Sequence, residues 1–251
     1  MKIKKILVSQ PKPQNDKSPY FDLAEKHKLT IDFRPFIEVK GIPAREFRQS
    51  KVNILDHSAV IFTSRTAIDH YFRIAEEMRI TIPDDMKYFC ISESTAFYLQ
   101  KYIVYRKRKI SYGNGKFDNL LTLIEKNSKE TFLVPLSDIH KAEIPTKLKK
   151  SKIKFTKAIL YRTVAADLSD LSDVNYDVLV FFSPSGIASL FENFPEFKQD
   201  NTNIAAFGPS TSKAVTDAGL ELNIKAPQPK APSMTMALEI FIKEFNKNGK
   251  K

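Results

Sequence analysis

The chain contains an internal repeat, and this feature restricts the possible folds more than any other. The segment Ile61–Ile68 (IFTSRTAI) resembles Val180–Ile187 (VFFSPSGI), which lies 119 residues later. A second pair, Ile91–Ala96 (ISESTA) and Phe207–Ser212 (FGPSTS), is separated by 116 residues. Two matched pairs in the same order and at nearly the same spacing indicate two copies of one structural unit.

Each copy alternates β-prone runs with segments of helical periodicity. Runs such as Ser58–Thr63 and Asp177–Phe182 are followed by Ser, Thr or Pro and then by helix-periodic segments such as Ala67–Met78. This alternation is typical of parallel sheets covered by helices on both faces, so we predict an α/β fold with two similar domains. Two longer extended runs, Thr30–Lys40 and Lys154–Ala165, occupy corresponding places in the copies, and we expect them to pair as a bridge.

Composition excludes several classes of protein. The 251 residues are 42% hydrophobic, which is enough to form two cores, and the single cysteine, Cys90, cannot form an internal disulfide. The four histidines are scattered, so we expect no metal site. The apolar run Ile6–Val8 is too short for a signal peptide, and no stretch approaches the roughly 20 apolar residues of a membrane span. We therefore expect a cytoplasmic protein without membrane contact.

Several common catalytic motifs are absent from the sequence. There is no GxGxxG, no GxxxxGK followed by Ser or Thr, and no GxSxG. Nucleotide-dependent enzymes and triad hydrolases are therefore disfavoured. Among the histidines only His70 lies near a repeated motif, and its place within a predicted helix indicates a solvent-facing residue.

Hydroxyl side chains recur where predicted strands lead into predicted helices. One explanation is helix capping, in which a Ser or Thr oxygen accepts from a free amide of the first helical turn. The other is anion binding, because parallel sheets bring these junctions to one edge, where helix N-termini present donors. The formal net charge of +11 also favours an anionic partner. The junction residues are Thr63, Ser64, Thr66, Ser92, Ser94, Thr95, Ser183, Ser185, Ser210, Thr211 and Ser212.

Tyr161 and two basic runs each allow two interpretations. Tyr161 in ILYRT is either a partly buried strand residue or a donor of a proton, since a phenol of pKa about 10 stays protonated at neutral pH.

The runs Lys101–Lys109 and Lys147–Lys157 are typical of solvated helix ends or lysine-protected edges, and less often of nucleic-acid surfaces. We expect no nucleic-acid partner.

Taken together, these segments resemble the uroporphyrinogen-III synthase family. The motifs that carry the resemblance are VIFTSRTAIDHYF, CISESTAFYL, PLSDIHKAEIPTKL, ILYRTV, DVLVFFSPSGIASLF, AAFGPSTSKAVTDAGL and APQPKAPSMTMAL. The resemblance implies two flavodoxin-like domains joined by a two-stranded β-ladder, with the active site in the cleft between them. One domain would be discontinuous (1–34 with 168–251), the other would span 42–155, and the ladder would comprise 35–41 and 156–167.

The implied activity is a cofactor-independent cyclisation by a monomeric enzyme. Linear hydroxymethylbilane, a tetrapyrrole with eight carboxylates, would lose water and close through a spiro intermediate with inversion of its last ring, giving uroporphyrinogen III. By the same resemblance Tyr161 would assist departure of the hydroxyl, and the amides of Gly186 and Ser212 would contact carboxylates. Ser92 stands where the family commonly has Gly, and Ser210 where Thr is usual. The implied substrate-binding residues are Thr63, Ser64, Thr95, Ser183, Ser185, Gly186, Ser210, Thr211 and Ser212.

A rival interpretation from another functional class remains open at this point. Two α/β lobes around a cleft also describe periplasmic-type binding proteins, which hold a small anionic ligand without turnover. The absence of an evident signal peptide disfavours this alternative.

Overall fold

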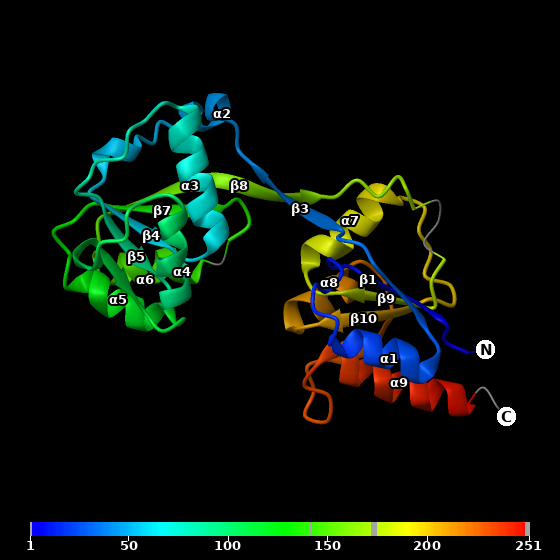
Figure 1. Ribbon diagram of the computed structural model, residues 1–251. Coiled ribbons are helices and arrows are strands. Elements are labelled where there is room, and N and C mark those ends of the chain that lie inside the picture. The colour runs from blue at the N-terminus through cyan, green and yellow to red at the C-terminus, as the bar shows by residue number, and fades with distance from the viewer. Residues whose placement is uncertain (1, 141, 172–174, 249–251) are drawn as a thin grey trace. The chain divides into compact units, whose positions relative to one another are not determined.

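The computed structural model describes residues 2–140, 142–171 and 175–248, and the chain divides into two units (Figure 1). Unit 1 combines Met1–Glu38 with Val164–Lys251, and unit 2 is Val39–Thr163. The chain therefore leaves unit 1 once and returns to it once. None of the described helices has an apolar stretch long enough to cross a membrane.

Unit 1 is built on a five-stranded parallel sheet in the order β11-β10-β9-β1-β2. Its strands are β1 (Lys5–Val8), β2 (Thr30–Phe33), β9 (Val178–Phe181), β10 (Asn203–Phe207) and β11 (Leu222–Ala226). Its helices are α1 (Pro19–His27), α7 (Pro184–Asn193), α8 (Pro209–Asp217) and α9 (Met234–Asn248).

Helices cover both faces of this sheet (Figure 1). Side chains alternate along β1, so that Ile6 and Val8 pack with α1 and α9, whereas Leu7 packs with α7 and α8. Both sets are buried, which explains why the central strands β1 (KILV) and β9 (VLVF) are nearly continuous apolar runs, whereas the edge strands β2 (TIDF) and β11 (LNIKA) are not.

Unit 2 contains a six-stranded sheet in the order β3-β8-β7-β4-β5-β6. Its strands are β3 (Ile37–Gly41), β4 (Ala59–Phe62), β5 (Lys87–Cys90), β6 (Ile110–Tyr112), β7 (Phe132–Ser137) and β8 (Phe155–Ala165). Its helices are α2 (Ala44–Gln49), α3 (Arg65–Glu77), α4 (Glu93–Tyr98), α5 (Phe117–Glu125) and α6 (Glu143–Lys150), with short 3₁₀ turns η1 (Ile54–Asp56), η2 (Leu99–Lys101) and η3 (Lys107–Lys109).

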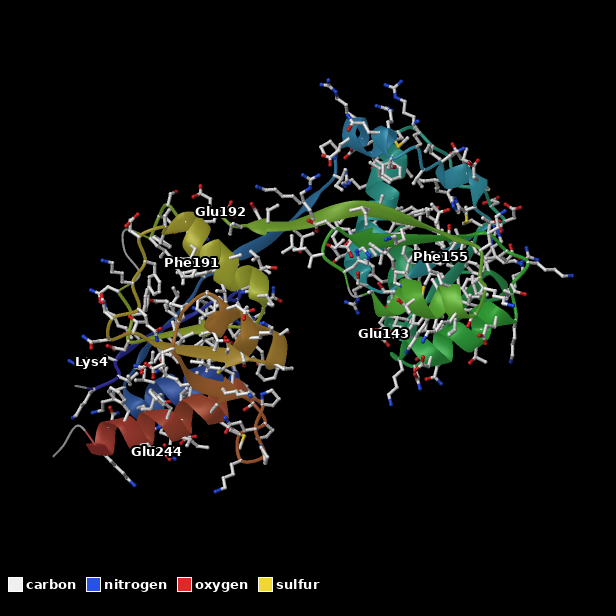
Figure 2. The ribbon with its side chains drawn as sticks, turned by 180° about the vertical axis from the view of Figure 1, so that it is seen from behind. Lys4, Glu143, Phe155, Phe191, Glu192 and Glu244 are labelled. Carbon is white, nitrogen blue, oxygen red and sulfur yellow. The ribbon has the colours of Figure 1, made fainter. Side chains whose placement is uncertain are left out.

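The sheet of unit 2 is also buried on both faces. Val60 and Phe62 of β4 pack with α3, whereas Ile61 packs with α5 and α6 on the opposite face. Figure 2 labels the first residues of two elements of this unit, Glu143 of α6 and Phe155 of β8. From β4 to β8 the neighbouring strands are parallel. The predicted fold of two α/β domains with parallel sheets is confirmed.

Strands β3 and β8 form the predicted ladder at the two places where the chain passes between the units. The amide of Ile42 donates to the Leu160 carbonyl, and the amide of Ala166 donates to the Phe36 carbonyl, each at 2.9 Å. Phe36 precedes β3 and is bonded to Ala166 after β8, whereas Ile42 follows β3 and is bonded to Leu160 within β8, so the two strands are antiparallel.

The extended run at Thr30–Lys40 consists of two strands. β2 ends at Phe33 and β3 begins at Ile37. Pro35 lies between them and has no amide hydrogen to donate to a ladder, which separates the strand of the unit 1 sheet from the strand that pairs with β8.

Candidate functional site

Strand order identifies the edge of each sheet at which a ligand is expected. In unit 2 the chain places β5 and β6 on one side of β4, and β7 and β8 on the other. In open parallel sheets, ligands bind outside the carboxyl ends of the strands where the order reverses in this way. That point lies between β4 and β7, which are followed by Thr63 and Ser64 and by Asp138, respectively.

A bulge in β8 places Tyr161 at this same edge. Leu136 pairs with Ile159 but the next residue, Ser137, pairs with Tyr161, so β8 has one residue more than β7 here. Bulges bend a strand and redirect its side chains. The backbone around Tyr161 is fixed by Asp138, whose amide donates to the Tyr161 carbonyl at 3.0 Å.

Asp138 is a supporting residue that sequence analysis missed. Its Oδ1 accepts from the Thr163 amide at 3.1 Å, from the Ile139 amide at 2.7 Å and from Ser137 Oγ at 2.8 Å. Desolvation raises the pKa of Asp138, but these hydrogen bonds outweigh it and the net shift is downward. The carboxylate therefore stays ionised. Through the Thr163 amide it binds the part of β8 that follows the bulge. The only signal in the sequence was an Asp directly after a predicted strand.

Tyr161 and Ser64, both predicted site residues, are in contact. Burial raises the pKa of Tyr161, and a hydrogen bond with the Ser64 side chain opposes that rise without reversing it. The phenol therefore remains protonated at neutral pH. Ser64 also caps α3, because its Oγ accepts from the Ala67 amide at 3.1 Å. The Ser64 hydroxyl group thus both caps α3 and interacts with Tyr161.

His70 is not the solvent-facing residue that its helical position predicts. It is half-buried, and its ring stacks on the Tyr161 ring with a centroid separation of 4.9 Å and an interplanar angle of 18°. Sequence periodicity places His70 correctly on α3, but it cannot show that β8 passes over this face of the helix.

The two copies of the second repeated motif differ in their backbone. Ser92 precedes α4 with an extended φ of −146°, which any residue adopts, and its Oγ accepts from the Thr95 amide at 3.3 Å. The residue at the matching place in unit 1 is Gly208, whose φ of +89° favours glycine. Ser92 is therefore compatible with its loop, and Thr95 is buried with its hydroxyl 3.0 Å from Ser92 Oγ.

Unit 1 has its own point of reversal, between β1 and β9. Ser183 follows β9, and its Oγ accepts from the Gly186 amide at 3.2 Å, which caps α7. A Cβ added at Gly186 would lie 3.3 Å from the Phe181 ring and 3.9 Å from Ser9 Oγ. Ser9, which follows β1, therefore belongs to this edge although sequence analysis did not select it.

The remaining predicted residues of unit 1 lie at the start of α7 and α8. Ser185 is half-buried, Ser210 is exposed, and Thr211 and Ser212 are buried. The Ser212 amide donates to the Gly208 carbonyl at 3.0 Å and its Oγ to the same atom at 2.9 Å. Both amides selected as carboxylate donors, those of Gly186 and Ser212, thus already have acceptors within the chain, and their role in binding stays a prediction.

No side chain caps α8, in contrast to α3, α4 and α7. Gly208 at its N-terminus has no side chain to accept from the first turn. The early amides of α8 are therefore oriented outward with the positive end of the helix dipole, an arrangement suited to an anion.

A matched pair of serines separates capping from support of Tyr161. We expect Ser64→Ala and Ser183→Ala each to lower the free energy of unfolding by about 1 kcal/mol, because each removes a cap. Only Ser64→Ala removes the hydrogen bond that lowers the pKa of Tyr161, so only this variant should raise that pKa further. Tyrosine-ring ¹³C NMR titration measures the shift. An equal shift in both variants would contradict the contact.

Comparison with known proteins identifies relatives over most of the chain. The family model described as Uroporphyrinogen-III synthase HemD matches residues 18–236. The uroporphyrinogen-III synthase of Chlorobaculum parvum is 22% identical over 257 residues, covering 96% of this chain and 100% of that protein. That of Saccharomyces cerevisiae is 25% identical over 149 residues, and the match covers 51% of this chain and 54% of the yeast protein, about half of its length.

A solved structure has a similar fold. The uroporphyrinogen-III synthetase of Helicobacter pylori 26695 superposes with a TM-score of 0.60 at 18% sequence identity, covering 96% of this chain and 100% of that chain. At this identity the similarity concerns the arrangement of strands and helices alone.

Proposed function

The chain belongs to the uroporphyrinogen-III synthase family, whose reaction is a step of tetrapyrrole biosynthesis, and from this premise we propose how its own residues perform the reaction. The substrate is hydroxymethylbilane. Loss of its hydroxyl group as water leaves an electron-poor azafulvene. Attack on this centre by the substituted carbon of the last pyrrole ring gives a spiro intermediate, and rearrangement gives uroporphyrinogen III with that ring inverted.

Tyr161 donates the proton that the departing hydroxyl needs. The carbon–oxygen bond breaks with its electron pair on oxygen, the phenol supplies the proton, and water leaves. The pyrrole N–H of the same ring then gives up its proton, which restores the phenol and leaves the neutral azafulvene. The observation that carries this role is a protonated phenol, near Ser64 and stacked with His70, at the edge of the sheet where the strand order reverses. General acid catalysis by a positioned group contributes about 10²–10⁴-fold to a rate.

The hydroxyl groups and amides at the strand-to-helix junctions bind the carboxylates of the substrate. In unit 2 these are Thr63, Ser64 and Thr95. In unit 1 they are Ser183, Ser185, Gly186, Ser210, Thr211 and Ser212, supported by the start of α8, which has no side-chain cap. Hydrogen bonds from neutral donors to carboxylates are strong because one partner is charged, and the net charge of +11 supplies a favourable field.

Holding the substrate in one geometry is as important as the acid. The azafulvene can close directly to the type I isomer, so the enzyme must favour attack by the substituted carbon. Fixing a flexible chain in a reactive conformation can lower a barrier by about 7–11 kcal/mol, which makes orientation sufficient to select the isomer.

We also propose that the enzyme is monomeric, that it is cytoplasmic, and that it has no nucleic-acid partner. The basic runs support the last point, since Lys101 pairs with Asp69 at 2.9 Å and Lys147 pairs with Asp118 at 2.6 Å within the chain. Incubation with hydroxymethylbilane and identification of the product tests the proposal. Binding without turnover would instead indicate an anion-binding protein, and steeply salt-dependent RNA or DNA affinity would indicate a nucleic-acid partner.

A further inference from the structure

We propose that His70 is a positioning residue for Tyr161, and that Arg73 and Gly41 hold His70 in place. The inference rests on the proposed function, because it assigns to these residues the orientation of the phenol that donates the proton. All four residues lie in unit 2.

The first step is the contact between the two rings. His70 lies one turn into α3, and Tyr161 lies on β8 at the bulge. Their rings are nearly parallel, with centroids 4.9 Å apart and planes inclined by 18°. A flat ring against one face of the phenol restricts its rotation. The Ser64 side chain lies near enough to the hydroxyl group to lower its pKa. The stacking thereby limits the directions in which the hydroxyl group can point.

The second step is the hydrogen bond that orients His70. Arg73, three residues further along α3, donates from Nε to His70 Nδ1 at 3.1 Å. An Nδ1 atom that accepts cannot carry a proton, so the proton of the neutral ring is on Nε2. This bond fixes both the tautomer and the plane of the imidazole.

The third step is the attachment of Arg73 to the ladder. Arg73 Nη2 donates to the Ile42 carbonyl at 2.9 Å and to the Leu160 carbonyl at 3.1 Å, and Nη1 pairs with Glu77. Leu160 directly precedes Tyr161 in β8. The guanidinium group therefore ties α3 to the backbone on which Tyr161 sits, and it does so through planar, multiply bonded geometry that lysine cannot reproduce.

Gly41 makes this attachment possible. A Cβ added at Gly41 would lie 2.7 Å from Cζ and Nε of Arg73, too close for the guanidinium group to remain. Its backbone does not lie in the left-handed region, so the requirement for glycine here is space. Any larger residue at position 41 would therefore occupy the space that the Arg73 guanidinium group now fills.

The charges around His70 favour its neutral form. Desolvation and the Arg73 charge lower its pKa, and the carboxylates of Asp69 and Glu77 on the same helix partly oppose them. From β8 it faces the uncharged phenol of Tyr161. Protonation at low pH would place a proton on Nδ1 and remove the acceptor for Arg73. We therefore expect the Arg73–His70 hydrogen bond, and the ring orientation that it fixes, at neutral pH and not at low pH.

Kinetic coupling between His70 and Tyr161 tests the inference. We expect His70→Ala to lower kcat about tenfold with KM within about twofold, because a misplaced catalytic group loses rate rather than substrate affinity. In a Tyr161→Phe background, which has no hydroxyl group to position, the same change should alter kcat less than about twofold. Equal losses in the two backgrounds would mean a merely structural role and would overturn the proposal.

Conservative and control variants sharpen the result. His70→Phe keeps a flat ring and should retain kcat within about threefold of wild type. Gly41→Ala should lower kcat about as much as His70→Phe and less than His70→Ala, because it displaces Arg73 but leaves the stacked ring in place. His57→Ala is the control: this buried histidine of unit 2 bonds the Asn53 carbonyl at 2.9 Å before β4 begins, and its loss should leave kcat unchanged. A fall in kcat for His57→Ala equal to that for His70→Ala would contradict the assignment.

NMR of the histidine rings tests the geometry without relying on turnover. The sequence has four histidines, so a long-range ¹H–¹⁵N spectrum resolves each tautomer. We expect His70 to carry its proton on Nε2 at neutral pH and its ring protons to move downfield when Tyr161→Leu removes the stacked ring. A proton on Nδ1, or unchanged shifts, would overturn the inference even in an active enzyme. An inactive wild-type protein would overturn the proposed function, and the inference with it.

Discussion

Tyr161→Phe should lower kcat for uroporphyrinogen III formation about 100-fold or more. The substitution removes the hydroxyl group that donates a proton to the leaving group, and a positioned general acid contributes about 10²–10⁴-fold. The ring remains, so its stacking with His70 and its burial are kept. Loss of one hydrogen bond should lower the free energy of unfolding by about 1 kcal/mol. Steady-state kinetics with chromatographic separation of the product isomers, together with thermal unfolding, measure both effects.

Tyr176→Phe is the matched control for this variant. Tyr176 also has a hydrogen-bonded hydroxyl group, which donates to Asp32 at 3.0 Å, but it lies before β9, at the edge of its sheet opposite the junction hydroxyls. We expect its kcat to equal that of the wild type. If the two variants had the same kcat, Tyr161 would have no role as an acid.

Phe62→Ala should lower the free energy of unfolding by roughly 3–5 kcal/mol, a large part of the 5–15 kcal/mol typical of a domain. Phe62 is the last residue of β4 and is 0% exposed. Its ring contacts Tyr71 edge-on at 5.4 Å and stacks with Tyr88 at 6.1 Å. Removing it leaves a cavity between β4 and α3, the helix that Ser64 caps. Urea denaturation measures the loss.

Phe97→Ala provides the comparison within the same unit. Phe97 lies on α4 and is 49% exposed, so its removal uncovers little and should cost less than about 1 kcal/mol. A similar loss of stability in the two variants would show that burial of Phe62 does not support the sheet as described.

Much of the fold follows from local pattern. The repeat predicts two copies of one unit, and the continuous apolar runs predict strands buried on both faces, because polar faces would interrupt them. The hydroxyl groups at strand ends were correctly placed at strand-to-helix junctions because the same residues serve as N-caps, as Ser64, Ser92 and Ser183 do. Capping has a local sequence signal that can be recognised without a structure.

Contacts that depend on strand order were not predictable in this way. Tyr161 meets Ser64 and His70 only because β8 contains a bulge and passes beside α3, and nothing near Tyr161 in the sequence encodes that approach. Asp138 was missed for the same reason, since its partner Thr163 is 25 residues away. The break between β2 and β3 has a local signal, because Pro35 cannot donate to a ladder.

Differences between the two copies also required the backbone. Ser92 and Gly208 occupy matching places, yet one is extended and the other has a φ of +89°. The repeat therefore preserves the position of the junction but not its capping: the Ser92 side chain accepts from the first turn of α4, whereas no side chain caps α8.

The isomer formed from hydroxymethylbilane tests the central claim most directly. Uncatalysed closure gives uroporphyrinogen I, so the fraction of the type III isomer should rise with the concentration of the purified protein until it is the main product. After oxidation to the porphyrins, chromatography separates the two isomers. Type I product alone at every protein concentration would contradict the account.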